Sequence, residues 1–394
     1  MMIDFLAEAA ALRDELIARR RDFHRHPELA FEETRTAGIV AQELAKLGLE
    51  VQTGVGKTGV IGLLEGELDG PTVLVRADMD ALPIQEENTF EHASAQPGVM
   101  HACGHDGHTT IALGVAKLLS QHRDRMAGRV KFVFQPAEEI VGGAKAMIAD
   151  GALRDPRPDV SVGLHLWNGM PFGRLGVADG PVMAGSSTFT LRITGKGGHA
   201  ASPHQAVDPV VCAAQIIIAF QTIVSRNANP LDSAVISVTQ LDAGTAFNII
   251  PQGVEMRGTI RAFRLEVRDL IERRMGEISR GIGEAMGCAT DLIIEHHVLP
   301  VVNHPEVSAR LRAVFGRMLG ADALELDERT MGAEDVGLFM TDIPGMYFFL
   351  GAAVPDQEIY YGHHHPRFDF CEDGLPLGAA LLAAAVAEYV LPGA

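Results

Sequence analysis

Apolar and polar positions in the first part of the chain follow two periodicities. Residues 4–24 and 33–47 carry apolar side chains at helical spacing, whereas TVLVRAD (72–78) is a nearly continuous apolar run, typical of a strand buried on both faces. The next predicted elements are a helix at about 108–121, a strand at 129–135, a helix near 143–149 and a strand within 159–167. This alternation predicts an α/β fold, with a mixed, mostly parallel sheet and helices on both faces.

The pattern changes near residue 183. STFTLRIT (187–194) alternates like a half-exposed strand, and it is followed by a helix at 208–225, two adjacent antiparallel strands (AVISVTQLDAG and VEMRGTIRAF), a helix at 265–286 and the strand ATDLIIEHHV. The order β-α-β-β-α-β is the split βαβ, or ferredoxin-like, arrangement. We therefore predict an inserted α+β domain at 183–294.

The first pattern then returns, with helices near 305–319 and 334–341, the strand MYFFLGA and a C-terminal helix. Residues 1–182 and 295–394 are accordingly predicted to form one domain around the insertion. The C-terminal stretch LPLGAALLAAAVAEYVL contains Glu388 and is expected to be a buried helix, not a membrane span. The N-terminal stretch MMIDFLAEAAALRDEL lacks a basic segment and is expected to be an amphipathic helix, not a signal peptide.

Composition narrows the classes of function. The chain has 394 residues, 47% of them hydrophobic, which suffices for a sizeable core. Its formal net charge of -18 argues against nucleic acid and against anionic membrane surfaces as partners. The four cysteines show no C-x-x-C spacing and need not form disulfides, so a cytoplasmic location is expected.

The densest chemical signal is MHACGHDGHTT (100–110), which precedes a predicted helix. Imidazole and thiolate ligands suit zinc, manganese, cobalt or nickel. The alternative is a polar helix N-terminus in which Asp106 and Thr109 act as caps. A cysteine flanked by histidine and glycine is unusual for a cap, so metal binding is the favoured interpretation.

Further candidates lie at the ends of predicted strands. QPAEE (135–139) offers two adjacent carboxylates, one able to bind metal and one able to act as general base, or else simply an acidic helix start. RADMDALP (76–83) offers a carboxylate, HLW (165–167) a single histidine that could also be a core residue, and YGHHHPRFDF (361–370) an imidazole-rich loop. Because carboxyl ends of parallel strands share one edge, these groups could converge on one site.

Taken together, these motifs resemble the amidohydrolase branch of the aminoacylase and carboxypeptidase metallopeptidases, typified by hippurate hydrolases and plant auxin-conjugate hydrolases. The matching pieces are RADMDALP, MHACGHDGHT, QPAEE, HLW, GKGGHAASPH, AFNIIP and HHHPRFDF, in the family's order, from about Phe23 to Phe370. The resemblance implies two divalent metal ions per subunit (Mn, Zn, Co or Ni). It implies as ligands Cys103, in a bridging position, with His105, Glu139, His165 and His364.

The resemblance also implies roles for residues that bind no metal. Glu138 would be the general acid/base, and Asp80 would orient a ligand. A metal-binding histidine of sister branches corresponds to Asp78 here, so no metal role is carried onto it. The run His363, His364, His365 leaves a register ambiguity, and the family ligand two residues before proline selects His364.

The inserted domain would be a lid and a dimerisation surface, which implies a homodimer or higher homo-oligomer. His199 and Asn248 match lid positions that contact substrate. GKGGHA also imitates a dinucleotide fingerprint, but its third glycine position is Ala200 and no acidic residue follows at the required place.

The expected activity is hydrolysis of the amide bond of a small N-acyl amino acid. Glu138 would take a proton from water, and a metal with His199 would stabilise the oxyanion. The alternatives are a metallo-carboxypeptidase or dipeptidase on the same scaffold, or a non-catalytic binding protein.

Overall fold

In the computed structural model, which describes residues 3–355 and 360–391, the chain folds as two compact units. Unit 1 comprises Met1–Val182, Val302–Arg329 and Asp335–Ala394, and unit 2 comprises Met183–Val301 and Thr330–Glu334. The second boundary lies at Val301 rather than at residue 294, because the last strand of unit 2 continues to Val298.

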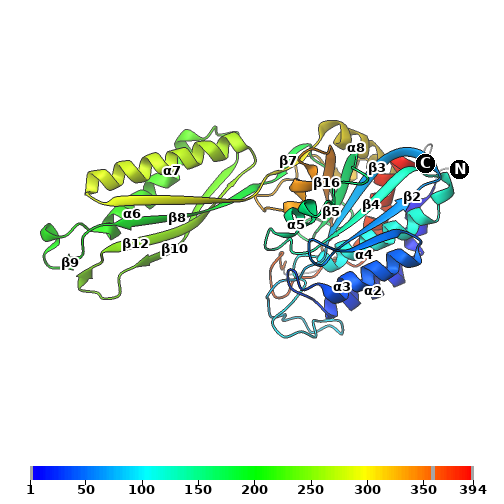
Figure 1. Ribbon diagram of the computed structural model, residues 1–394, viewed down its shortest axis with the longest axis horizontal. Helices are drawn as coiled ribbons and strands as arrows, with labels where there is room; N and C mark the ends of the chain where they lie inside the picture. The colour runs from blue at the N-terminus through cyan, green and yellow to red at the C-terminus, as the bar shows by residue number, and fades with distance from the viewer. Residues whose placement is uncertain (1–2, 356–359, 392–394) are drawn as a thin grey trace. The chain divides into compact units, whose positions relative to one another are not determined.

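Unit 1 is built on an eight-stranded sheet with the order β1-β2-β4-β3-β5-β16-β6-β15 (Figure 1). Its strands are β1 (Glu50–Val55), β2 (Gly59–Glu65), β3 (Leu68–Asp78), β4 (Ala127–Gln135), β5 (Val160–Trp167), β6 (Leu175–Gly176), β15 (Leu324–Glu325) and β16 (Gly345–Gly351). The central strands β4, β3, β5 and β16 are mutually parallel. Their carboxyl ends therefore lie at one edge of the sheet, and the predicted mixed α/β sheet is confirmed.

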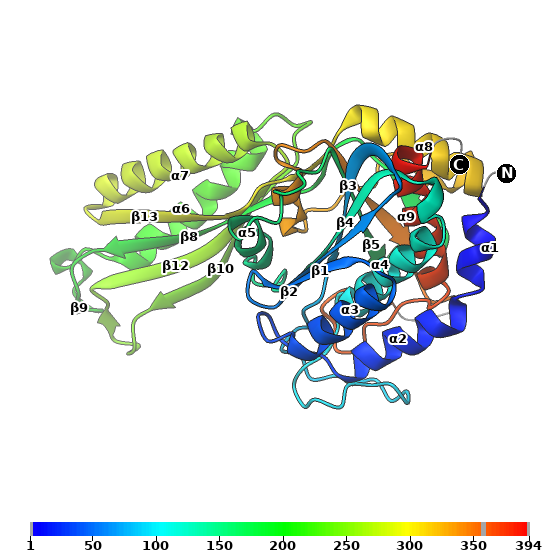
Figure 2. The same cartoon turned by 45° about the vertical axis from the view of Figure 1, so that its right-hand side comes forward.

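Helices cover both faces of this sheet (Figure 2). They are α1 (Phe5–Ala10), α2 (Arg13–Arg25), α3 (Thr34–Lys46), α4 (His105–Ser120), α5 (Gly143–Ala149), α8 (Pro305–Leu319) and α9 (Gly374–Val390). On β3, Val73 and Val75 join the larger core with α4 and α9, whereas Leu74 joins a smaller core with Met147 of α5. Successive side chains of β3 thus enter opposite cores, as the pleat of a strand requires. Because both faces of β3 are buried, its sequence is a continuous apolar run.

Two local predictions need correction, and one hairpin was missed. The helix predicted at 4–24 is interrupted, since α1 ends at Ala10 and α2 begins at Arg13. The helix predicted near 334–341 is a 3-10 helix, Asp335–Met340. The hairpin of β1 and β2 was not predicted, because most side chains of β1 are exposed and give no apolar periodicity.

Unit 2 contains β8 (Gly185–Thr194), α6 (Pro209–Thr222), β10 (Ala234–Ala243), β12 (Gly253–Ala262), α7 (Leu265–Met286) and β13 (Ala289–Val298). Its four-stranded sheet has the order β10-β12-β8-β13, with every neighbouring pair antiparallel. Phe189 of β8, Phe220 of α6 and Met275 of α7 are buried together between sheet and helices. The predicted ferredoxin-like arrangement is confirmed.

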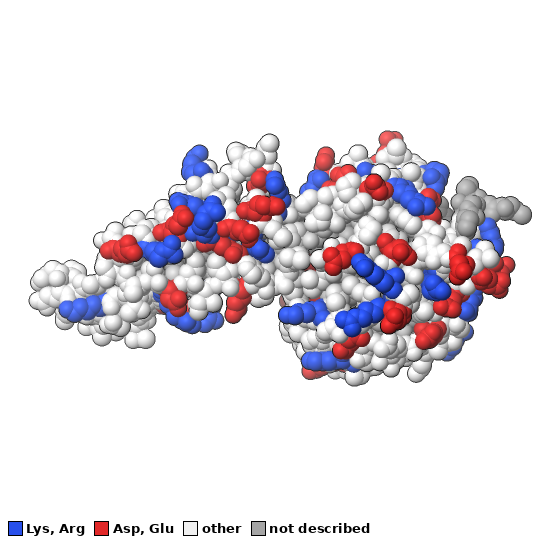
Figure 3. Space-filling model, turned by 45° about the horizontal axis from the view of Figure 1, so that its top comes forward, with Lys and Arg blue, Asp and Glu red and all other residues white. Residues whose placement is uncertain are grey.

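Helix α6 with its following π turn, Pro209–Asn227, is long and apolar enough to cross a membrane by length and composition alone. Its Cys212, Ile216 and Phe220 nevertheless pack into the core of unit 2. On the face drawn in Figure 3, Lys and Arg lie interspersed with Asp and Glu. The acidic excess of the chain is therefore partly balanced locally, as in the Arg268–Glu272 pair of α7.

Candidate metal centre

The candidate site residues of unit 1 lie at the carboxyl edge of its sheet. Asp78 ends β3, Glu138 and Glu139 follow β4, and His165 stands near the end of β5. These strands are neighbours in the order β4-β3-β5. Cys103 just precedes α4 and His105 begins it, and the ligand atoms of both lie close to that of His165. The topology thus brings together groups that lie far apart in the sequence.

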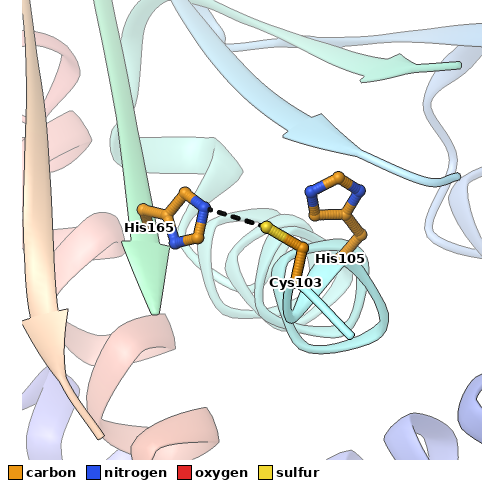
Figure 4. Close-up of side chains that lie close together, drawn as sticks. All are labelled: Cys103, His105 and His165. Atoms are coloured by element: carbon orange, nitrogen blue, oxygen red, sulfur yellow. Dashed lines mark hydrogen bonds between the residues drawn. The ribbon is translucent and has the colours of Figure 1, made fainter. Parts of the chain in front are cut away.

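Cys103 lies between two sets of ligand atoms. One set joins Cys103 with His105 and His165, and the other joins Cys103 with Glu139 and His364; in each, the ligand atoms lie within 4.8 Å of one another. The Sγ of Cys103 is 3.7 Å from Nε2 of His165 (Figure 4). Because both sets share the sulfur, the geometry suits two metal ions bridged by one thiolate.

The backbone sets the tautomer of His105. Its Nδ1 lies 2.9 Å from the carbonyl oxygen of Asp80, which can only accept a hydrogen bond. Nδ1 therefore carries a proton, and in the neutral ring Nε2 keeps a lone pair. This Nε2 is 3.8 Å from Oε1 of Glu139 and faces the shared site. A hydrogen bond that fixes the tautomer of a ligand histidine is usual in metal centres.

The backbone of Leu166 fixes three further histidine rings. The pairing of β3 with β5 ends at Arg76 and Gly163. Beyond that point the Leu166 N–H donates to Nε2 of His108, and its carbonyl accepts from Nδ1 of His165 and from Nε2 of His363. Nε2 of His165 is thereby left as an acceptor beside Cys103, and burial lowers the pKa of His165 well below its usual range. His165 is therefore a neutral potential ligand.

The histidine run near the C-terminus presents one ring to the site. Nε2 of His364 lies 3.3 Å from Oε2 of Glu139, and His364 adopts a positive φ of 66°. His363 binds Leu166 instead, and Nδ1 of His365 accepts from the Arg367 N–H. Hydrogen bonds to Cys103 and Glu139 raise the pKa of His364 to about 10, so this position attracts positive charge.

Asp80 holds the chain that carries both glutamates. Its Oδ1 accepts from the backbone N–H of Glu138 and its Oδ2 from that of Glu139, both at 3.0 Å. One carboxylate thus fixes two successive residues. Glu138 is buried, with Oε2 4.0 Å from Nε2 of His105, so its side chain reaches the same site as the ligands.

Asp106 and Thr109 do not cap α4, so that alternative is wrong. The N-cap is Gly104, in a left-handed conformation with φ 92° that glycine adopts without steric cost. Asp106 binds Arg20 and His24 of α2 at 2.9 and 2.8 Å. Although burial opposes ionisation, Arg20 and His24 hold the pKa of Asp106 well below its usual range. This buried ion pair fixes the start of α4 behind Cys103 and His105.

Two buried polar atoms test whether the site fits a metal ion. Nε2 of His105 and Oε1 of Glu139 have no hydrogen-bond partner among the described residues. Leaving such atoms unpaired costs roughly 1–3 kcal/mol each, so they need a ligand. Burial and Glu139 raise the pKa of the Cys103 thiol, and a bound cation would reverse that effect. The donor set of thiol, imidazole and carboxylate therefore fits divalent transition metals.

His108 and its partner Asp78 were not assigned a role from the sequence. Nδ1 of His108 lies 2.6 Å from Oδ1 of Asp78, while its Nε2 accepts from Leu166, so His108 has no ring nitrogen left for a metal. Asp78 also binds Arg76 at 2.7 Å. The spacing of His105 and His108 by three residues on one helix could have indicated that both rings face the sheet.

His199 and Asn248 lie together in unit 2. His199 belongs to the short strand β9 (Gly198–His199) and pairs with Ile249 of β11 (Ile249–Ile250). The carbonyl of Asn248 accepts from the Ala200 N–H at 3.1 Å. The His199 side chain is exposed, and its Nδ1 accepts from Ala201, which leaves Nε2 protonated as a donor in the neutral ring.

Comparison with known proteins decides the family. The sequence profile of the peptidase family M20/M25/M40 matches residues 74–388. The chain belongs to this family. The resemblance inferred from the motifs is therefore confirmed.

Several members of the family that are similar to this chain are named for a hydrolytic activity. An N-acyl-L-amino acid amidohydrolase of Geobacillus stearothermophilus is 45% identical over 322 residues, covering 80% of this chain and 86% of that protein. Thermostable carboxypeptidase 2 of Saccharolobus solfataricus is 40% identical over 94% of this chain and 95% of its own. A dinuclear metal-binding M20 peptidase of Bacillus subtilis has the same fold, with a TM-score of 0.84 and 34% identity over 95% of this chain and 98% of its own.

Proposed function

We propose that this M20 protein is a dinuclear metal-dependent amidohydrolase that cleaves N-acyl amino acids. The observation that carries the proposal is the pair of ligand sets sharing Cys103, with Glu138 at their side. The similar Geobacillus protein is named an N-acyl-L-amino acid amidohydrolase, and the similar Bacillus structure is described as dinuclear.

The chain would hold its two ions with five side chains. Cys103 would contact both, His105 and His165 would complete one site, and Glu139 and His364 the other. Bound divalent ions polarise an amide carbonyl and lower the pKa of water, whichever of Mn, Zn, Co or Ni is present. The hydrogen bonds of His105 to Asp80 and of His165 to Leu166 would keep both rings in the metal-binding tautomer.

Glu138 would move the protons of the reaction. It takes one proton from the attacking water, whose oxygen forms the new bond to the acyl carbon. It then delivers that proton to the amide nitrogen as the C–N bond breaks. The products are a carboxylic acid and a free amino acid. Asp80 would act through the backbone, by holding Glu138 and Glu139 in place.

Unit 2 would act as a lid and as a dimerisation surface. His199, with its Nε2–H available, would donate to the oxyanion, and Asn248 beside it would contact substrate. Helix α6 contains no charged residue and exposes Val211 and Ile218, and β10 is an edge strand. A second copy of the chain that packs on α6 and β10 would bury these apolar side chains and the unpaired edge of β10. The result would be a homodimer or a higher homo-oligomer.

Substitution on α6 tests the dimer. Ile218→Lys would place a charge in the covered face and shift the protein towards monomer in light scattering. Leu68→Lys is the matched control, because Leu68 is 57% exposed and belongs to unit 1, outside the surface of α6 and β10. Equal oligomeric states for the two variants would contradict an interface on α6.

A carboxypeptidase activity is the second candidate, favoured by the similarity to the Saccharolobus carboxypeptidase. A small-molecule substrate is common to both candidates. A cytoplasmic location is part of the proposal as well, because all four cysteines are free: Cys103, Cys212, Cys288 and Cys371.

The two activities differ in the group on the carbonyl side of the scissile amide bond. An acylated substrate presents an uncharged acyl group, whereas a dipeptide presents a free amine.

A hydrolysis screen separates the candidates. Protein stripped by a chelator and reloaded with Mn, Co, Ni or Zn would be assayed on hippurate-like N-acyl amino acids, on N-blocked peptides and on free dipeptides. We expect no turnover without metal, and the highest kcat/KM on N-acyl amino acids after reloading. Full activity in metal-free protein would refute the metal mechanism, and preference for peptides would favour the carboxypeptidase.

A further inference from the structure

Backbone strain gathers beside the two active-site glutamates. Ala137 and Val141, which flank Glu138 and Glu139, have positive φ angles of 51° and 57°. Phe31 and Lys57 share this unusual conformation, with φ angles of 64° and 80°. Residues other than glycine adopt it rarely, and it persists only where neighbouring groups impose it. A neighbouring group must therefore hold the backbone around Phe31, Lys57 and Ala137 in this conformation.

One buried carboxylate contacts the strained segments. Glu33 is fully buried at the start of α3. Its Oε1 accepts from the backbone N–H of Phe31 and of Ala137, each at 2.9 Å, and its Oε2 accepts from the hydroxyl of Thr58. Thr58 directly follows Lys57 in the β1–β2 turn. Glu33 thereby joins the loop before α3, this turn and the loop after β4.

We infer that Glu33 is a positioning residue for the active site, which together with Asp80 aims Glu138 and Glu139. Glu33 binds the N–H of Ala137, and Asp80 binds those of Glu138 and Glu139, so three successive backbone groups are held by two carboxylates. This inference rests on the proposed roles of Glu138 as acid/base and of Glu139 as metal ligand.

Removing the carboxylate should let the loop relax. Phe31 and Ala137 would each lose the acceptor of a backbone N–H, and Ala137 would no longer be held at positive φ. Among the described hydrogen bonds, Asp80 holds the N–H groups of Glu138 and Glu139, and only Glu33 holds that of Ala137. A displacement of about 1 Å in a catalytic group typically costs about 100-fold in rate.

Two substitutions of Glu33 test separately the length and the charge of its side chain. Glu33→Gln keeps the length: its oxygen can accept from both N–H groups while its amide donates to Thr58. Glu33→Asp keeps the charge but is one methylene too short to reach Ala137 and Thr58 together. Burial raises the pKa of Glu33, so its site tolerates an uncharged group. If reach matters, Glu33→Gln will exceed Glu33→Asp in activity.

Glu28 provides a matched control. Its carboxylate also accepts two backbone N–H bonds, from Arg35 and Thr36, and one threonine hydroxyl, from Thr34. These partners belong to α3 and not to the loop after β4. Glu28→Ala therefore removes the same number and kind of hydrogen bonds without freeing Ala137.

The experiment measures turnover and metal affinity in these four variants and in the wild type. For Glu33→Ala we expect kcat at saturating metal to fall about 100-fold with little change in KM. Competition with a chelator should show one of two Co²⁺ sites weakened by about 10- to 100-fold, as is usual when the support of a ligand is lost. Glu33→Gln and Glu28→Ala should stay near wild type in both measurements.

Three results would overturn the inference. The first is a folded Glu33→Ala variant with wild-type kcat and Co²⁺ affinity, and the second is a Glu28→Ala variant as impaired as Glu33→Ala. The third applies if Glu33→Ala does not fold. In that case the inference fails if Glu33→Asp is as active as Glu33→Gln or more active. A failure of the proposed function would look different. The wild type would then hydrolyse no N-acyl amino acid, while Glu33→Ala would still bind Co²⁺ at one site with lower affinity than the wild type.

Discussion

The two units present their candidate site residues in contrasting ways. In unit 1 the ligand rings and carboxylates are mostly buried, and each is fixed by a named partner, as His105 is by Asp80 and His165 by Leu166. In unit 2 His199 is exposed on a short strand, and its ring binds only the neighbouring Ala201 within the described contacts. Unit 1 is therefore preorganised for chemistry, whereas the contribution that we propose for His199 would be made only when substrate is bound.

Substitution of Glu138 tests the chemistry of unit 1 alone. General acid–base catalysis contributes about 100- to 10,000-fold, so Glu138→Gln should lower kcat by that amount. The metal content should stay at two ions per chain, because Glu138 is proposed to move protons and not to bind metal. Elemental analysis of Glu139→Gln provides the contrast, with metal lost. If the two variants show the opposite pattern, their roles are exchanged.

Substitution of His199 tests the contribution of unit 2. Loss of one oxyanion donor costs about 100- to 1000-fold in kcat, so His199→Ala should show this loss while binding metal normally. If His199 serves the partner's site in a dimer, co-expression with Glu138→Gln should restore activity in heterodimers, which contain one intact composite site. Purified heterodimers as inactive as their parents would show that His199 acts within its own chain.

Substitution of Asp80 tests the support beneath the site. Asp80→Asn keeps the shape but replaces one acceptor with an amide group, so the N–H of Glu138 or of Glu139 loses its partner. Loss of such support typically costs about 10- to 100-fold in metal affinity or activity. Chelator competition and steady-state kinetics measure both quantities. Values unchanged from wild type would mean that Asp80 does not position the glutamates.

Much of the fold follows from local patterns. The buried run of β3 and the alternation of β8 were readable because each strand has one or both faces in a core. Edge strand β1 was missed because its exposed side chains carry no such signal. The interruption between α1 and α2 was missed because apolar spacing continues across it.

The chemical types at the site were predictable, but their support was not. Cys103 and His105 stood out in a dense run of metal-binding residue types, and Glu138 and Glu139 stood out as adjacent carboxylates after a predicted strand. The bond of His105 to the Asp80 carbonyl and that of Glu33 to Ala137 join residues distant in sequence, and they involve backbone atoms that every residue shares. No local pattern can reveal such contacts, which depend on how β3, β4 and α3 pack.

The shared position of Cys103 in both ligand sets implies that its thiolate would contact both metal ions. Titration of metal-free protein with Co²⁺, followed by absorption spectroscopy and elemental analysis, tests it directly. We expect two equivalents per chain, with a thiolate-to-cobalt absorption band that grows with both and is absent from Cys103→Ser. A wild type that binds two Co²⁺ without this band, or a Cys103→Ser variant with the same spectrum and affinity, would contradict a thiolate shared by both ions.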